Sequence, residues 1–150
     1  MKIELRNVAY NARLSEETSA YAADVWIDGK KAGTTQNAGH GGPDLIRPRE
    51  LEEKLTAYAL TLPVIKSKWG DLPESAETLL GGCLTRFLTA RDLKRALKTK
   101  LLFMRAGKVM GCKVGSLGWE PEAARLLPGD GPVLNGLPFE EALTLFMSPA

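Results

Sequence analysis

The sequence has little histidine, little cysteine and no long apolar run. It contains one histidine, His40, and two cysteines, Cys83 and Cys112, which lie far apart and form no C-x-x-C pair. These residues are a poor ligand set for structural zinc, and so few cysteines favour a reduced, cytoplasmic protein with two incidental thiols. No apolar run approaches the ~20 residues that span a bilayer, and the first residues have no signal-peptide core, so we expect no membrane partner.

The residues that are present are ordinary in amount but uneven in placement. A chain of 150 residues, 44% hydrophobic and 25% charged, predicts one soluble domain, 1–150, that can bury a substantial core. The net charge is only +2, yet residues 86–113 hold nine basic residues against one acidic residue, a net +8. The remaining residues hold 11 basic and 17 acidic residues, a net −6. Such a band of positive charge favours an anionic partner.

The N-terminal part predicts an antiparallel meander of three strands. Apolar and polar residues alternate from Ile3, with a bulge expected near Asn7, and again over 21–27 and 31–36. Asp28-Gly29, between the second and third strands, is a typical two-residue hairpin turn.

Helices and one further hairpin are predicted in the rest of the chain. The hairpin is expected to turn at Ala106-Gly107. The pair Gly81-Gly82 falls inside a helical pattern, which close packing of another element would explain. The fold class is therefore α+β, with a mostly antiparallel sheet, a later hairpin and four to five helices. Helices are expected from Pro48 to Leu62, from near Pro73 to Leu88, behind an N-cap at Thr89, over 120–127, and after Pro138.

The glycine-rich loop 37–42 is the strongest candidate for a site. Its glycines let a ligand approach the backbone N–H groups, as in an anion-binding nest. His40 is the candidate catalytic residue, as a general acid or base or as a phosphate donor, and Asn37 suits a base or ribose edge. The loop is neither a Walker motif nor a dinucleotide fingerprint. A histidine bonded to backbone, in a plain glycine turn, is the alternative.

A stripe of cations is predicted on the helix behind Thr89. Arg91, Lys94, Arg95 and Lys98 fall at i, i+3, i+4 and i+7. The stripe is either a solvated face or a surface for phosphate, and we hypothesise that it converges with the loop into one pocket. We expect no metal or cofactor. The predicted ligand-binding residues are Asn37, Gly39, His40, Gly41, Gly42, Arg47, Arg91, Lys94, Arg95 and Lys98.

Other candidate residues give weaker indications. Glu16, Glu17 and Asp24 are possible Mg²⁺ ligands, although carboxylates in a polar turn are usually solvated. The three tryptophans are able to stack a base, although each is more often a core residue. No serine or cysteine pairs with His40 in a recognisable catalytic pattern.

Several segments resemble a family of small uncharacterised bacterial and phage proteins. They are Ser15-Glu16-Glu17-Thr18, the segment 26–33, the loop N-x-G-H-G-G and the segment 92–108. The family carries no assigned activity, so the resemblance implies a phage or mobile-element setting and little chemistry. In that setting, the protein would sequester a host immune signalling nucleotide.

Three functions therefore remain open. In the first hypothesis, the protein binds a small phosphorylated or nucleotide ligand. The loop 37–42 contacts the ligand, and the cations of the stripe neutralise its negative charge. Alternatively, it is a small phosphoesterase or nucleotide hydrolase that uses His40. In the third hypothesis, it contacts nucleic acid or a host protein through Arg91–Lys98. The sequence leaves open whether the chain forms a homo-oligomer.

Overall fold

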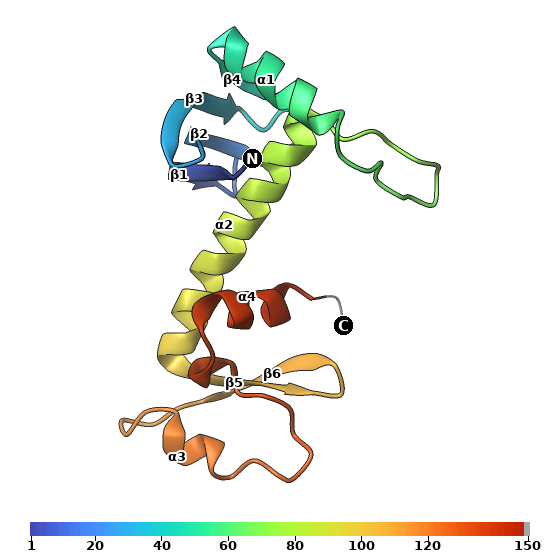
Figure 1. Ribbon diagram of the computed structural model, residues 1–150. Coiled ribbons are helices and arrows are strands. Elements are labelled where there is room, and N and C mark those ends of the chain that lie inside the picture. The colour runs from blue at the N-terminus through green and yellow to red at the C-terminus, as the bar shows by residue number, and fades with distance from the viewer. Residues whose placement is uncertain (149–150) are drawn as a thin grey trace. The chain divides into compact units, whose positions relative to one another are not determined.

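The computed structural model describes residues 1–148 and divides the chain into two compact units, Met1–Thr85 and Arg86–Ala150 (Figure 1). The single domain 1–150 stays a prediction. The α+β class is confirmed, because the described residues form a four-stranded antiparallel sheet, a separate hairpin and four α-helices. Within residues 1–148, no helix combines the length and the apolar character needed to cross a membrane.

The sheet of unit 1 contains the predicted meander and one more strand. Its order is β1-β2-β3-β4, and every neighbouring pair is antiparallel. The register shifts between Arg6 and Ala9, which confirms the predicted bulge, and Asn7 has a φ of 52° there. Asp28 and Gly29 form the predicted turn with φ values of 49° and 81°. The strands are β1 (Ile3–Asn11), β2 (Ala20–Ile27), β3 (Lys30–Asn37) and β4 (Leu45–Arg47).

The core of unit 1 lies between this sheet and helices α1 (Arg49–Ala59) and α2 (Ala76–Thr99). Figure 1 shows the first half of α2 crossing one face of the sheet. Alternate residues of β2 point to that side, and Val25 is fully buried. Helix α1 ends at Ala59 rather than at Leu62, and Pro48 is its N-cap instead of its first residue. The buried apolar side chains include Leu5, Tyr21, Ala23, Val25, Ile27, Ile46, Leu51, Leu55, Leu80 and Leu84.

Helix α2 corrects two sequence-based predictions. It continues through Thr89, so the predicted helix break there is wrong. A threonine inside a helix costs only a fraction of a kcal/mol, and no glycine or proline follows that would end the helix. The close packing expected at Gly81-Gly82 is also wrong, because a Cβ at either residue would meet nothing within 4 Å.

A reciprocal hydrogen-bond pair, which the sequence analysis missed, begins α2. The Thr78 N–H donates to Ser75 Oγ at 3.2 Å, and the Ser75 N–H donates to Thr78 Oγ1 at 2.8 Å. This arrangement has the form of a capping box, with threonine in the place of the usual glutamate or glutamine. It explains why the helix begins at Ala76 and not at Pro73.

Unit 2 is built around the predicted hairpin. Strands β5 (Lys100–Arg105) and β6 (Lys108–Lys113) turn at Ala106-Gly107, as predicted. Helices α3 (Glu120–Ala123) and α4 (Phe139–Met147) follow, with the short 3₁₀ helix η1 (Leu134–Gly136) between them. Helix α3 is shorter than the predicted 120–127. The core cluster consists of Leu93, Leu102, Leu134, Ala142 and Leu143.

Strand β5 is hydrogen-bonded on both sides. Besides β6, it contacts the segment before η1, where the Met104 N–H donates to the Pro132 carbonyl at 3.1 Å. The Asn135 side chain continues this contact: its Oδ1 accepts from the Leu102 N–H at 2.8 Å, and its Nδ2 donates to the Lys100 carbonyl at 2.9 Å. These bonds fix β5 as the central strand of unit 2, while β6 is largely exposed.

Candidate functional site

Asn37, at the end of β3, is the centre of the glycine-rich loop. Its Oδ1 accepts from Thr18 Oγ1 at 2.7 Å and from the Gly39 N–H at 2.8 Å. Its Nδ2 donates to Asp44 Oδ1 at 3.0 Å and to the Gly42 carbonyl at 3.2 Å. An asparagine amide has two donor hydrogens and two acceptor lone pairs, so all four positions are used inside the protein. Asn37 therefore shapes the loop instead of presenting a free amide to a ligand.

Asp44 connects this loop to the buried face of the sheet. Tyr21 Oη donates to Asp44 Oδ2 at 2.8 Å and lies 3.1 Å from Thr35 Oγ1. Burial, together with the adjacent Asp44 carboxylate, raises the pKa of the Tyr21 hydroxyl well above its usual value. The hydroxyl is therefore a neutral, structural donor. The two oxygens of Asp44 thus hold Tyr21 on one side and Asn37 on the other.

His40 is exposed at the tip of the loop and faces a carboxylate. Its Nδ1 lies 3.3 Å from Glu16 Oε2, and both side chains are more than half exposed. A carboxylate beside imidazole can orient the ring as a general base. Among residues 1–148, no group of three or more His, Cys, Asp or Glu side chains is placed to hold a metal ion.

The backbone of the loop and its surroundings oppose anion binding. The Gly39 carbonyl accepts from the N–H groups of Glu16 and Glu17, at 3.0 and 3.1 Å, which brings both glutamates against the loop. The Glu17 carboxylate lies so close to Gly41 that a Cβ there would overlap it. Gly39, Gly41 and Gly42 have φ values of 88°, 81° and 99°, so turn geometry alone accounts for the glycines.

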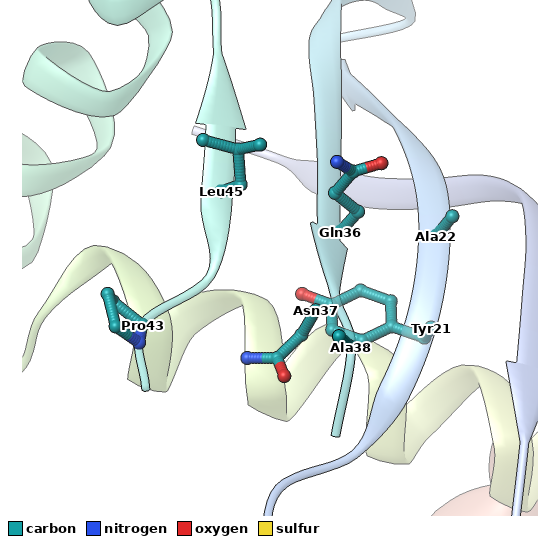
Figure 2. A pocket seen from close by; sticks show the side chains of 7 residues that line it. All are labelled: Tyr21, Ala22, Gln36, Asn37, Ala38, Pro43 and Leu45. Carbon is teal, nitrogen blue, oxygen red and sulfur yellow. The ribbon is translucent and has the colours of Figure 1, made fainter. Parts of the chain in front are cut away.

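Two shallow hollows lie beside the loop, on the exposed side of the sheet. The first, of about 430 Å³, is lined by Ala22, Gln36 and Leu45 from three neighbouring strands and by Tyr21, Asn37, Ala38 and Pro43. In Figure 2, Leu45, Gln36 and Ala22 lie on adjacent strands, while α2 passes behind the sheet. The second hollow, of about 480 Å³, shares Tyr21, Ala22, Asn37 and Ala38 and includes His40.

Two arginines of unit 2 form ion pairs with carboxylates that are distant in the sequence. Arg86 pairs with Glu140 of α4. Arg105 makes a two-pronged contact with Asp130, with Nε 2.6 Å from Oδ1 and Nη2 2.9 Å from Oδ2. These bonds hold α4 and the segment around 130 against the rest of unit 2, so both arginines have structural roles.

Five further exposed cations come from the end of α2 and from the paired end of the β5–β6 hairpin, and we call them together the basic surface: Lys94, Arg95 and Lys98 of α2, Lys100 of β5 and Lys113 of β6. Lys100 and Lys113 lie directly opposite each other in the hairpin, and the Val114 N–H donates to the Thr99 carbonyl at 3.3 Å beside them. Within the described part of the chain, none of the five forms an ion pair with a carboxylate. Lys94 Nζ lies 5.2 Å from the centroid of the Phe139 ring.

Lys100 and Lys113 were not among the predicted site residues. The predicted turn at Ala106-Gly107 fixes the register of the hairpin, so the opposition of these two lysines was available from the sequence. Arg91 was predicted to bind the ligand but is a weaker candidate than the five. Its Nε is buried, and it forms an ion pair with Asp92, whose Oδ1 lies 3.8 Å from the Nε.

The remaining predicted residues occupy scattered places. Arg47 is exposed on β4 opposite Thr34 and does not line either hollow. Asp24 is bound to Asn7 at 2.7 Å and to Lys31 at 3.3 Å, so it is not a free metal ligand. The loop belongs to unit 1 and Arg91–Lys98 to unit 2, and the convergence of the two into one pocket stays a prediction.

The tryptophans also differ from one another. Trp26 is covered by Arg6, whose guanidinium carbon is 3.9 Å from the ring centroid, and Trp119 is half-buried. Only Trp69 presents a largely exposed ring.

A scan against protein-family models, a search of curated proteins and a search of solved structures each give no match to this chain. The resemblance to the bacterial and phage family therefore stays a prediction, and function has to be argued from the geometry.

Proposed function

We propose that the protein binds a nucleic acid through the basic surface of unit 2. The observation that carries this proposal is the placement of Lys100 directly opposite Lys113, with no carboxylate pairing either lysine among the described residues. Like charges opposite each other in a sheet destabilise it by roughly 0.2–1 kcal/mol. A bound phosphate between the two ammonium groups would remove that cost.

Helix α2, which precedes the hairpin, adds three more positive charges to the basic surface. Lys94 and Lys98 are four residues apart and Arg95 and Lys98 three apart, so their charges repel along α2. The negative end of the helix dipole accounts for Lys98 in the last turn. It does not account for Lys113, which belongs to a strand. An anion that spans helix and hairpin, as a nucleic-acid backbone does, explains all five residues together.

The geometry favours backbone contact over base reading. Lysine is a compact point charge on a flexible stem, and four of the five residues are lysines. Such contacts position phosphates and carry no sequence information. The expected activity is therefore sequence-tolerant binding that weakens steeply with salt.

A charge-reversal pair tests this function. Lys100→Glu/Lys113→Glu should weaken the binding of a labelled duplex or single strand by about tenfold or more at moderate salt, measured by fluorescence anisotropy. The matched control is Lys30→Glu/Lys54→Glu, which makes the same charge change at two exposed lysines of unit 1. If both variants lose affinity equally, net charge alone explains the binding and the proposed surface is refuted.

A small ligand in unit 1 is the second candidate function. The hollows beside the loop, of about 430 and 480 Å³, fall in the size range of small-molecule sites. Glu16, Glu17 and Asp44 around the loop favour the base or sugar part of a nucleotide over its phosphates. Sequestration of a host signalling nucleotide by a phage-encoded protein belongs to this candidate.

A nucleotide panel separates binding from cleavage. Each nucleotide is incubated with the protein, and both the bound and the free fractions are identified by mass spectrometry. His40→Ala should abolish any turnover if the histidine is catalytic, and should only weaken affinity if the site binds. If no nucleotide is retained or altered, the hollow is not a nucleotide site.

A further inference from the structure

Three polar side chains on the outer face of the unit 1 sheet have no partner within residues 1–148. The Thr34 hydroxyl, the Gln36 amide and the Arg47 guanidinium form no hydrogen bond or ion pair there. Thr34 and Arg47 lie directly opposite each other in the β3–β4 pair, and Gln36 lies opposite Leu45. All three polar residues are exposed, so their side chains are available to a ligand.

These side chains point away from the core of unit 1. Thr35 and Ile46, which lie between them on β3 and β4, are buried. Successive side chains of a strand point to opposite faces, so the residues on either side of Thr35 and Ile46 share the outer face. Opposite residues on one face are about 5 Å apart, and residues two apart on one strand are about 7 Å apart. The contiguous patch that results consists of Thr34, Gln36, Leu45 and Arg47.

The patch connects the first hollow to a positive charge. Gln36 and Leu45 line this hollow of about 430 Å³, and Figure 2 shows Gln36 between Leu45 and Ala22 on adjacent strands. Arg47 follows Leu45 by two residues on β4, on the side of the hollow away from the glycine-rich loop. A group bound in the hollow is therefore one row of side chains away from the Arg47 guanidinium.

The two ends of the hollow differ in charge. At the loop end, Asp44 follows the lining residue Pro43, and the Glu17 carboxylate lies against Gly41. At the other end, Arg47 has no ion-pair partner in the described part of the chain. The carboxylate in its row of the sheet, Asp24, lies 3.3 Å from Lys31. An anionic group is repelled from the first end and attracted to the second, so the hollow orients a ligand that carries one anionic group.

We propose that the hollow and the patch bind a nucleoside monophosphate, with its base on Gln36 and its phosphate on Arg47 and Thr34. This inference rests on the small-ligand function proposed for unit 1. The Gln36 amide offers a donor and an acceptor side by side, which match the hydrogen-bonding edge of a base. Leu45 and Ala22 give the base an apolar contact surface. The Arg47 guanidinium suits a two-pronged contact with phosphate oxygens, and Thr34 Oγ1 adds a donor.

Matched ligands test the two halves of this site. Equilibrium dialysis measures the affinity of the protein for AMP, GMP, CMP and UMP, for the four corresponding nucleosides, and for inorganic phosphate. At least one monophosphate should bind about tenfold more tightly than both its nucleoside and inorganic phosphate, because its base and its phosphate are held together. Arg47→Gln should remove this advantage and leave the affinity for the nucleoside unchanged.

Four further variants locate the ligand. Gln36→Ala should weaken the monophosphate and its nucleoside by the same factor, about fivefold to tenfold. Ala22→Trp should abolish the binding of both, because the indole fills the hollow. Arg13→Gln makes the same charge change as Arg47→Gln at an exposed arginine of the β1–β2 connection, and should leave the affinity for the monophosphate unchanged. Lys100→Gln/Lys113→Gln should also leave it unchanged, which excludes the basic surface as the binding site. Thermal unfolding confirms that each variant is folded.

The results that overturn the inference differ from those that refute the small-ligand function. Equal affinity for nucleoside and monophosphate, or equal losses in Arg47→Gln and Arg13→Gln, would remove the phosphate contact and leave a small-ligand site in the hollow. Inorganic phosphate that binds as tightly as every monophosphate would show an adventitious ion only, and would also overturn the inference. Absence of binding by every nucleoside and monophosphate would refute both proposals for the hollow.

Discussion

Lys100 and Lys113 are direct cross-strand partners at the end of the β5–β6 hairpin that lies away from its turn. Two ammonium groups held opposite each other destabilise the hairpin, and no carboxylate in residues 1–148 forms an ion pair with either one. The pair therefore gives no benefit to folding. The benefit that we propose is the binding of a phosphate backbone, in which the same repulsion becomes attraction for an anion.

The charge pair predicts opposite effects on stability and on binding. A single Lys113→Glu substitution places a carboxylate opposite Lys100, so the free energy of unfolding should rise by roughly 0.2–1 kcal/mol. Nucleic-acid affinity should fall in the same variant. Urea unfolding and anisotropy measure the two quantities. Lys113→Gln is the control, with a smaller gain in stability. A loss of stability in Lys113→Glu would show that the lysines do not repel each other in the folded protein.

The glycine pair in α2 predicts a gain in stability without a change in contacts. Gly81 and Gly82 are exposed, and a Cβ at either position meets nothing within 4 Å. Gly81→Ala and Gly82→Ala should each raise the free energy of unfolding by about 0.5–1 kcal/mol, because alanine restricts the unfolded chain and favours the helix. Thermal or urea unfolding gives the measurement.

Gly33 provides the contrast to this pair. A Cβ there would overlap the Arg47 carbonyl and would lie 2.6 Å from Leu51 Cδ2. Gly33→Ala should therefore destabilise unit 1 by about 1–3 kcal/mol. If all three alanine variants changed stability in the same direction, the space found around these glycines would be contradicted.

The hydrogen bonds of the Asn37 amide predict that this residue stabilises the fold of the loop. Asn37→Ala removes four hydrogen bonds and leaves the Thr18 hydroxyl and the Gly39 N–H without their acceptor, so unfolding free energy should fall by about 1–3 kcal/mol. Gln36→Ala is the matched control, because the exposed Gln36 side chain forms no side-chain hydrogen bond within the described region. Equal stability of the two variants would show that Asn37 is free for a ligand.

The Arg105–Asp130 pair predicts an acid-dependent contribution to the stability of unit 2. The hydrogen bonds from Arg105 and the Leu127 N–H lower the pKa of Asp130 below its usual value of 3.8. A lowered folded-state pKa means that this stabilisation is fully present above about pH 4 and is lost as the pH falls below that value. Asp130→Asn should therefore be less stable than the parent at neutral pH, with the difference shrinking in acid. A difference that stays constant down to the lowest pH at which both fold would contradict the assignment.

The sequence predicted the elements whose causes are local. Asp28-Gly29 and Ala106-Gly107 need positive φ values, which mark their turns, and the alternation from Ile3 predicted β1 and its bulge. It did not predict β4, because three residues are too short for a period to appear. The break at Thr89 was wrong because an N-cap residue type was weighed above the apolar pattern, which continues to Leu93 and joins the two predicted helices.

Only part of the candidate site could be predicted from the sequence, because part of it depends on contacts between distant segments. Asn37 and the glycines were identified as unusual, but whether a polar side chain bonds within the protein or to a ligand depends on partners such as Thr18 and Asp44, which come from other segments. The pairing of Lys100 with Lys113 could have been predicted, because the turn at Ala106-Gly107 sets the register of the hairpin. The stripe of cations predicted from the sequence covered one helix face only, and the two strand residues were therefore left out.

The salt dependence of nucleic-acid affinity tests the central claim most directly. The logarithm of the association constant for a duplex should fall linearly with the logarithm of salt concentration between about 50 and 200 mM, with a slope close to −0.9 for each phosphate contacted. The slope should become shallower by about 0.9, for the one phosphate proposed between the two lysines, in Lys100→Gln/Lys113→Gln, and should stay unchanged in Lys30→Gln/Lys54→Gln. An unchanged slope in the first variant, or no measurable binding by the parent at the lowest salt, would contradict the account.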